Sequence, residues 1–357
     1  MAEILAIGCT HYPMLLWPDD RWTAFHQHHL DSPRIPEARK DPASWPLEMQ
    51  KEWGDNGANA LASAVRHRTW LVDRFRKLRK EIDDFNPDFV LIWGDDQYEN
   101  FTEDLIPPFC VYIQDKFESR PYEKDIERGY GNMWGFQPDK MYTTRGHPNG
   151  AKYLTTQLLE MGYPMPYSYK GLHHQGLAHA FINTLLFLDY DNKGEGWNYP
   201  VVPFHVNCYG SSVIRNRGSF ALNAEPDSEP DPPAPSARLC YEVGAATARA
   251  LKASPWRVAV VGSSSWSHAF LTKKHDLLWP DVESDRERFE ELRTGRQELW
   301  KNLEMSQIED SGQQELLNWV CLAGAMTELD AKPEFIEMTA TYIFNSPKVM
   351  MVARSAA

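Results

Sequence analysis

The sequence lacks the features that define a membrane, secreted or nucleic-acid-binding protein. No stretch approaches the roughly 18 apolar residues that a membrane span needs, and the opening residues 1–16 carry an acid where a signal peptide is basic. The five cysteines are scattered and have no CxxC spacing, which suits a reducing compartment. A formal charge of -13 repels phosphate backbones and anionic lipid. We therefore expect a cytoplasmic protein with no membrane or nucleic-acid partner.

What the chain does contain is enough apolar material for a large core. Its 357 residues are 42% hydrophobic and 24% charged, which is typical of a globular protein. Strand and helix patterns alternate along it. Strands are expected at 3–9, 88–93, 199–207 and 257–263, and helices at 57–85, 151–162 and 236–254, the last with Ser236 as N-cap. This alternation favours an α/β fold with helices on both faces of a central sheet.

Two segments interrupt the alternation. Residues 18–54 are long, irregular and aromatic, and loops of that length in compact domains are often functional, so we expect an inserted lid. Residues 224–236, "AEPDSEPDPPAPS", are acidic and rich in proline and are expected to form a solvated loop. Neither is taken as a domain boundary, and we expect a single domain over residues 1–357.

Polar residues follow several of the expected strands. His11 comes after the first strand, the stretch "GDDQ" (94–97) after the second, and His268 after the strand at 257–263. Ligands of α/β proteins bind at the carboxyl ends of strands, where these side chains can converge. Glu315 lies among apolar residues at the start of an expected helix, 311–326, and an acid there is costly unless it is paired, solvated or metal-bound.

These residues carry a resemblance to a known family. The chain resembles the class III extradiol ring-cleaving dioxygenases, which include the β subunit of protocatechuate 4,5-dioxygenase, and the resemblance runs through nearly the whole sequence. The matching stretches are "THYP" (10–13), "PDFVLIWGDDQYENFTEDLIPPF" (87–109), "GHP" (146–148), "HHQGLAHAF" (173–181), "PFHVN" (203–207), "GSSSWSHAFL" (262–271) and "QELLNWVCLAGAM" (314–326). Their order and spacing together carry the resemblance, since none is specific alone.

The resemblance implies a central mixed sheet flanked by helices and a non-haem Fe(II) site, or one for another divalent metal. Two histidines and one carboxylate leave open positions for a catecholate and dioxygen. His11 matches the first histidine ligand, Glu315 the carboxylate, and His268 the catalytic acid/base histidine. The family also implies a homo-oligomer, with or without a small separate subunit. The expected function is oxidation or cleavage of a catechol-like aromatic substrate with dioxygen.

The chain departs from the family at two positions. Gln97, directly after Asp96, stands where the second histidine ligand is expected, and an amide oxygen is a poorer ligand for Fe(II) than imidazole. Near the substrate, Gln175 replaces a histidine, with His174 one residue earlier. We therefore keep His174 and Gln175 as catalytic candidates, and Gln97 and Asp96 as metal-binding candidates.

Three explanations of these departures stay open. In the first, the metal remains and is held by His11, Glu315 and either Gln97 or Asp96, with a further histidine from His26, His28 or His29 or from residues 173–179. In the second, the fold binds an aromatic ligand with altered or absent metal chemistry. In the third, the chain is a non-catalytic subunit of a two-subunit dioxygenase. Retention of His11, Glu315 and His268 argues against the third.

Overall fold

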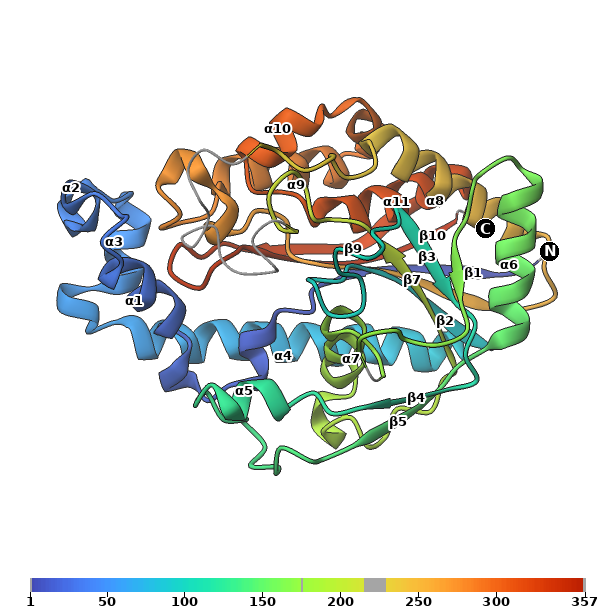
Figure 1. Ribbon diagram of the computed structural model, residues 1–357, viewed down its shortest axis with the longest axis horizontal. Helices are drawn as coiled ribbons and strands as arrows, with labels where there is room; N and C mark the ends of the chain where they lie inside the picture. The colour runs from blue at the N-terminus through green and yellow to red at the C-terminus, as the bar shows by residue number, and fades with distance from the viewer. Residues whose placement is uncertain (1, 175, 215–228, 356–357) are drawn as a thin grey trace.

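The computed structural model describes residues 2–174, 176–214 and 229–355, and its centre is one eight-stranded sheet (Figure 1). The strands are β1 (Ile4–Cys9), β2 (Phe89–Gly94), β3 (Phe109–Tyr112), β4 (Lys116–Ser119), β5 (Tyr142–Arg145), β6 (Tyr167–Ser168), β7 (Val201–Val206), β8 (Val258–Ser263), β9 (Ala331–Thr339) and β10 (Lys348–Ser355). The order in the large sheet is β6-β3-β7-β2-β8-β1-β10-β9, while β4 and β5 form a separate hairpin.

Four adjacent strands at the middle of this sheet, β7, β2, β8 and β1, run parallel. Strand β3 pairs with β7 antiparallel on one side, and β10 pairs antiparallel with both β1 and β9 on the other. The parallel strands are buried along their whole length, as strands covered on both faces must be. Because they are parallel and in register, their carboxyl ends meet at one edge of the sheet.

Helices cover both faces of the sheet (Figure 1). They are α1 (Ala24–Asp31), α2 (Glu37–Lys40), α3 (Leu47–Trp53), α4 (Ala60–Phe85), α5 (Glu123–Glu127), α6 (Pro148–Glu160), α7 (His179–Leu188), α8 (Ala237–Lys252), α9 (Val282–Arg293), α10 (Met305–Asp310) and α11 (Leu316–Glu328). One hydrophobic core packs α4 and α7 against the sheet, and a second packs α6, α8 and α11 against the opposite face. The expected α/β fold, with a central mixed sheet flanked by helices, is confirmed.

The expected strands and helices are present within a few residues of their predicted ends. Ser236 caps α8 as expected, since its side chain accepts a hydrogen bond from the backbone N–H of Leu239. The segment 18–54 differs from the expectation of a bare loop, because it contains α1, α2 and α3. Its large residues Trp22, Trp45 and Met49 are buried, and burying them holds these short helices in place. Of the expected loop at 224–236, residues 224–228 lie outside the described residues, and 229–236 contain no helix or strand.

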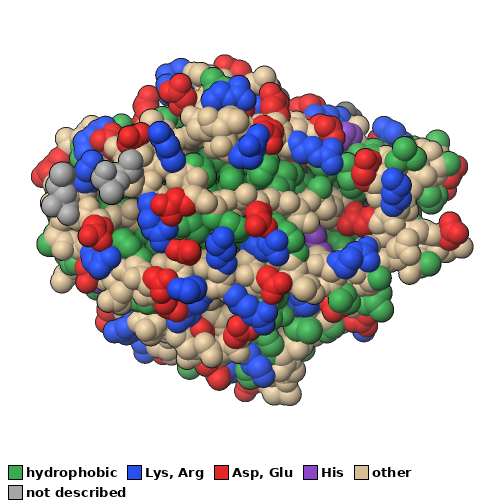
Figure 2. Space-filling view, turned by 180° about the vertical axis from the view of Figure 1, so that it is seen from behind, with side chains coloured by type: hydrophobic (Ala, Val, Ile, Leu, Met, Phe, Trp, Pro, Cys, Tyr) green, Lys and Arg blue, Asp and Glu red, His purple; other side chains and the backbone are tan. Residues whose placement is uncertain are grey.

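Side chains at the surface carry mixed charge. Figure 2 shows Lys and Arg side chains interspersed with Asp and Glu on one face of the molecule. Within the described ranges, no helix combines the length and the apolar character needed to cross a membrane. All five cysteines are buried and free, so no disulfide contributes to the fold.

Candidate active site

The side chains that follow the parallel strands meet in one buried cluster. His11 follows β1, Asp95 follows β2 and His268 follows β8, while Glu315 lies at the N-terminus of α11. Each has at most 6% of its surface exposed. The structure therefore brings together the three residues that the resemblance assigned to the site, His11, Glu315 and His268, although they are up to 304 positions apart in the chain.

Helix α11 is fixed against the ends of two strands, and this fixes Glu315. A side chain at Gly8 of β1 would lie 2.1 Å from the Trp319 ring, so only glycine lets this ring pack on the strand. The Trp319 indole N–H donates to the carbonyl of Ser264 at 3.0 Å. The Ser264 hydroxyl donates in turn to the backbone carbonyl of Glu315 at 2.8 Å. The start of the helix is thus tied to the end of β8.

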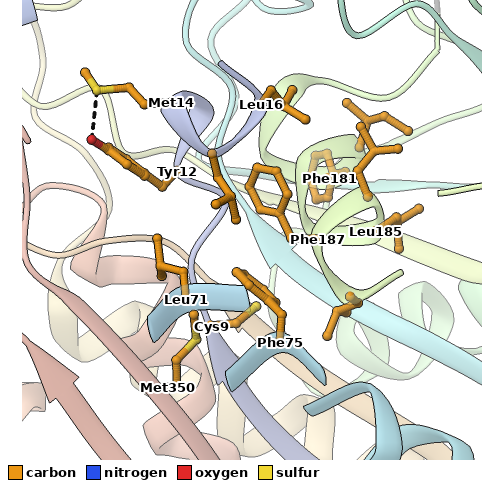
Figure 3. Packing of buried hydrophobic residues seen from close by; sticks show 14 of the residues in the cluster. Cys9, Tyr12, Met14, Leu16, Leu71, Phe75, Phe181, Leu185, Phe187 and Met350 are labelled. Atoms are coloured by element: carbon orange, nitrogen blue, oxygen red, sulfur yellow. Dashed lines mark hydrogen bonds between the residues drawn. The ribbon is translucent and has the colours of Figure 1, made fainter. Parts of the chain in front are cut away.

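The packing around β1 fixes His11 in the same way. Figure 3 shows side chains of α4 and α7, among them Phe75 and Phe187, packed around Cys9 at the end of the strand, with Tyr12 and Met14 beyond it. The Asn183 side chain of α7 donates to the backbone carbonyl of His11 at 3.3 Å. The loop that carries His11 is therefore anchored on both sides.

Both histidines present the same nitrogen to Glu315. Nδ1 of His11 lies 3.0 Å from the carbonyl oxygen of Ser263, and Nδ1 of His268 lies 3.0 Å from that of Trp266. A carbonyl only accepts, so each Nδ1 carries the proton and each Nε2 keeps its lone pair. Each Nε2 lies 3.5 Å from Oε2 of Glu315.

Burial keeps the imidazole rings neutral. It lowers the pKa of His11 well below its usual range, and the nearby His179 and His268 rings add to this. It also lowers the pKa of His268 to about 3. A neutral imidazole is the form that binds a metal or accepts a proton. Both histidines are therefore ready for either role.

Glu315 is an acid with one satisfied oxygen and one free oxygen. Oε1 accepts a hydrogen bond from Nε2 of Gln97 at 2.7 Å, whereas Oε2 is buried without a hydrogen-bond partner among the described residues. Burial raises the pKa of this carboxyl well above its usual range, and Asp95 adds to the shift. A buried carboxylate oxygen facing two imidazole lone pairs is what a cation site requires, because the cation would replace the missing partner.

Gln97 points at Glu315 and orients it. Its amide is assigned with the nitrogen toward Oε1, since a carboxylate is an acceptor. In this arrangement Gln97 donates a hydrogen bond to Glu315, the carboxylate that the resemblance assigned as a metal ligand. Gln97 thus lies beside a candidate ligand and supports it. The sequence expectation considered Gln97 only as a replacement for a metal ligand.

Asp96 faces away from the cluster. Its carboxylate accepts hydrogen bonds from the backbone N–H groups of Glu99 and Asn100 at 2.9 and 2.8 Å and from the Tyr209 hydroxyl at 2.5 Å. These bonds hold the loop after β2 and use both carboxylate oxygens. The structure therefore does not bring Asp96 together with His11.

The neighbouring Asp95 points into the cluster. Its Oδ1 lies 3.7 Å from Nε2 of His11 and accepts a hydrogen bond from the Asn318 side chain at 3.0 Å. Its Oδ2 is buried and has no hydrogen-bond partner in the described part of the chain. Burial raises the pKa of Asp95 to about 6. Asp95 thus adds a second carboxylate to the cluster.

His179 is the further histidine in the cluster, and it comes from the range 173–179 that the sequence left open. Ligand atoms of His11, Asp95 and His179 all lie within 4.8 Å of one another, a grouping that could hold a metal ion. Nδ1 of His179 lies 2.6 Å from Oε2 of Glu99, which fixes the ring. Burial disfavours the charged ring, but Glu99 outweighs it and raises the pKa of His179 to about 10. A carboxylate that orients a histidine is a common support for a metal ligand.

The other predicted histidines lie outside this cluster. His174 lines the cavity described next and its Nε2 lies 3.1 Å from the carbonyl of Leu177. Gln175 lies outside the described residues. Of the three histidines in α1, His28 lines the cavity, while His26 packs against the rings of Trp45 and Trp53.

Residues of the cluster, among them His11, His268 and Glu315, line a cavity of about 950 Å³. Aromatic and apolar side chains line it together with polar and charged ones, and the cluster supplies the buried imidazoles and the carboxylate. The cavity-lining residues include Tyr12, Trp17, Phe25, Tyr130, Ile182 and Phe270. Pockets of 300–1,000 Å³ with a few convergent polar groups are typical of small-molecule sites. Because His11, His268 and Glu315 line the cavity, an organic substrate there can reach two neutral imidazoles and one buried acid.

Comparisons with known proteins agree with the motifs. Residues 231–346 match the family model described as the catalytic LigB subunit of aromatic ring-opening dioxygenase. A 2,3-dihydroxyphenylpropionate/2,3-dihydroxicinnamic acid 1,2-dioxygenase of Photorhabdus laumondii is 25% identical over 209 residues, 58% of this chain and 52% of that protein. A second enzyme of that name, from Pseudomonas putida, is 25% identical over 198 residues, 56% of this chain and 49% of that protein.

The chain spans about half the length of the curated relatives it matches. The matched family segment contains His268 and Glu315, whereas His11, Asp95 and His179 lie outside it. The resemblance to class III extradiol dioxygenases is confirmed by these matches.

Proposed function

We propose that this chain is a non-haem, metal-dependent dioxygenase. Its residues 231–346 match the family model described as the catalytic LigB subunit of aromatic ring-opening dioxygenase. Its substrate is a catechol-like aromatic compound, and dioxygen is the co-substrate. The observation that carries the proposal is the free Oε2 of Glu315, buried between the Nε2 atoms of His11 and His268. The relatives' names, which denote dioxygenases acting on dihydroxyphenyl acids, support the reaction class. The five free cysteines suit a cytoplasmic enzyme.

The donor set fits Fe(II). His11 and His179 are the imidazole ligands in this proposal, and Glu315 and Asp95 are the carboxylates that face them. Two histidines with a carboxylate are the ligand set of non-haem Fe(II) oxygenases. When bound, Fe(II) supplies open positions for the two substrate oxygens and for dioxygen. In the free protein the raised pKa values of His179, Glu315 and Asp95 favour their protonated forms, and these groups would release protons to the solvent when a cation binds.

The surrounding residues supply proton transfer and a closed environment. Nε2 of His268 accepts a proton from one substrate hydroxyl, because this nitrogen is unprotonated and its ring is held through Nδ1. The same nitrogen returns the proton later in the reaction, so His268 acts as base and then as acid. Tyr12 and Phe270, which line the cavity, exclude water from the aromatic ring of the substrate and face the apolar surface of that ring.

The direct test is metal analysis followed by an oxygen-uptake assay. Purified protein should contain iron after anaerobic loading, and one molecule of dioxygen should be consumed for each catechol opened. A panel of catechols, hydroxybenzoates and aminophenols covers the substrate class. Protein that binds a catechol yet consumes no oxygen when loaded with iron would contradict the proposal and would instead indicate a repurposed member of the family.

Replacing Gln97 with Met should weaken metal binding about 10- to 100-fold, the usual effect of removing a residue that orients a ligand. The reason is that Met keeps the approximate size of Gln97 but cannot donate to Oε1 of Glu315. The measurement is a titration with Fe(II) under anaerobic conditions. Gln157→Met in α6, which removes a surface hydrogen bond to Glu160, is the matched control. Unchanged affinity in Gln97→Met would show that Glu315 needs no orienting donor.

A further inference from the structure

A second, smaller cavity lies beside the candidate metal cluster, and we call it the small chamber. It has a volume of about 20 Å³, above the roughly 10–15 Å³ that one water-sized molecule needs. Gln97, Phe270 and Glu315 line both the small chamber and the large cavity of about 950 Å³, so these three side chains separate the two spaces. The small chamber therefore adjoins Glu315, the carboxylate proposed to bind the ion.

Two segments of the chain supply the rest of the lining of the small chamber. The loop after β7 contributes Cys208 and Val213, and the short 3-10 helix η7 (Ala269–Leu271) contributes its last residue. Cys208 and Leu271 are buried, whereas Val213 is half-buried and reaches the surface. The small chamber thus extends from near the surface at Val213 to the buried carboxyl group of Glu315.

The lining of the small chamber is mainly apolar. Val213, Phe270 and Leu271 are hydrophobic. Burial raises the pKa of the Cys208 thiol well above its usual range, so this thiol stays neutral and behaves as a small hydrophobic group. Four of the seven described residues that line the small chamber therefore offer apolar surface.

The three polar residues of the lining form hydrogen bonds within the protein. Nε2 of Gln97 donates to Oε1 of Glu315 at 2.7 Å, and Oε2 of Glu315 faces the histidines of the cluster. The Tyr209 hydroxyl donates to Asp96 at 2.5 Å and accepts from the backbone N–H of Tyr98 at 3.1 Å. A bound water needs two to four polar partners, and polar groups with partners of their own serve it poorly. The small chamber therefore suits an apolar molecule better than water.

We propose that the small chamber binds dioxygen and admits it to the metal site past Gln97. This inference rests on the proposed function, which makes dioxygen the co-substrate. Dioxygen is apolar and close to water in size, so it fits a space that is too small for an organic substrate. A catechol in the large cavity is separated from the small chamber by Phe270, and it leaves this path open.

Krypton tests the small chamber independently of turnover, because krypton is apolar, is close to dioxygen in size and scatters X-rays anomalously. Crystals of the full-length protein under krypton pressure should contain an atom bounded by Val213, Phe270 and Leu271. Val213→Phe places a ring in the small chamber and should remove this atom, whereas Leu271→Ala enlarges the small chamber and should raise the krypton occupancy. A water molecule bonded to Gln97 or Glu315 in place of krypton would overturn the proposal.

Kinetics test whether the small chamber serves the reaction. In Val213→Phe the KM for dioxygen should rise about tenfold, the effect of losing a small apolar binding site, while the KM for a catechol stays within about twofold. Leu271→Phe fills the small chamber from η7 and should give the same result, which covers the case that Val213→Phe does not fold. The matched control is Val65→Phe, which adds the same ring at an exposed position of α4 and should change neither KM. An unchanged KM for dioxygen in a variant that has lost krypton would show that the small chamber does not supply dioxygen.

The two measurements separate this inference from the proposed function. If the unaltered protein consumes dioxygen with a catechol but binds no krypton in the small chamber, the proposed function stands and the dioxygen site is wrong. If krypton binds there but no catechol leads to dioxygen uptake, the proposed function is wrong, and the assignment of dioxygen to the small chamber fails with it.

Discussion

Replacing Glu315 with Gln is expected to remove bound metal and turnover together. The change keeps the shape of the side chain but exchanges the charged Oε2, which faces the Nε2 atoms of His11 and His268, for a neutral amide. Losing about 4 kcal/mol of metal-assisted stabilisation corresponds to a fall in turnover on the order of 10³-fold. Metal content by mass spectrometry and oxygen uptake with a cleaved catechol are the two measurements.

A control substitution at the other end of the same helix tests whether the effect of Glu315→Gln comes from loss of the charge at the site or from loss of any negative charge in the helix. Glu328→Gln changes an acid in α11 whose ion pair with Arg249 lies at the surface, and it should keep both metal and turnover. If Glu315→Gln retained its full metal content, Glu315 would have no part in binding the ion. The remaining acid of the cluster, Asp95, would then be the carboxylate ligand.

Replacing His268 with Ala is expected to lower turnover about 10²- to 10⁴-fold while the metal stays bound, because that is the usual contribution of a general acid/base. His11 and His179 are the proposed imidazole ligands and His268 is the proposed acid/base, so His268 is not expected to hold the ion. Oxygen uptake and metal content should therefore separate in this variant, whereas they change together in Glu315→Gln.

His275→Ala is the control for this substitution. His275 lies in the next turn of chain and stacks on Trp279 away from the cluster, so its replacement should leave turnover within a few-fold. Two results would argue against the role of His268. Turnover within a few-fold of the parent would mean that no proton passes through His268, and loss of metal would mean that His268 is a ligand.

The sequence predicted the parts of the fold that depend on local pattern. The parallel strands and the helices between them follow from hydrophobic periodicity, and His11 and His268 follow from their position at strand ends. Strands β9 and β10 were not predicted. Strand β9 pairs with β10, and β10 joins the sheet by pairing with β1, which brings together residues over 340 positions apart in chain order, as in Ala6 with Ala353. Local pattern contains no record of such a contact.

In the candidate site, too, some features follow from local sequence pattern and others depend on contacts between distant residues. Asp95 and Asp96 are adjacent in sequence, yet side chains of adjacent residues at a strand end point to different sides, and only Asp95 enters the cluster. His179 was left within a range because its support comes from Glu99, 80 positions earlier. One signal was present in the sequence, since "HAF" occurs both at 179–181 and at 268–270. The role of Gln97 depends on its contact with Glu315, which no local pattern encodes.

The distribution of the cluster along the chain also determines when it can form. Residues His11, Asp95, His179 and Glu315 span most of the polypeptide, so a ribosome has to release nearly all of the chain before these groups can meet. A shortened product that ends before α11 would lack a complete set of donors and would not retain an ion. An ion that binds only the finished fold stabilises that fold by mass action. Binding of the metal ion would therefore stabilise the contact between the first strand and α11 at a late stage of folding.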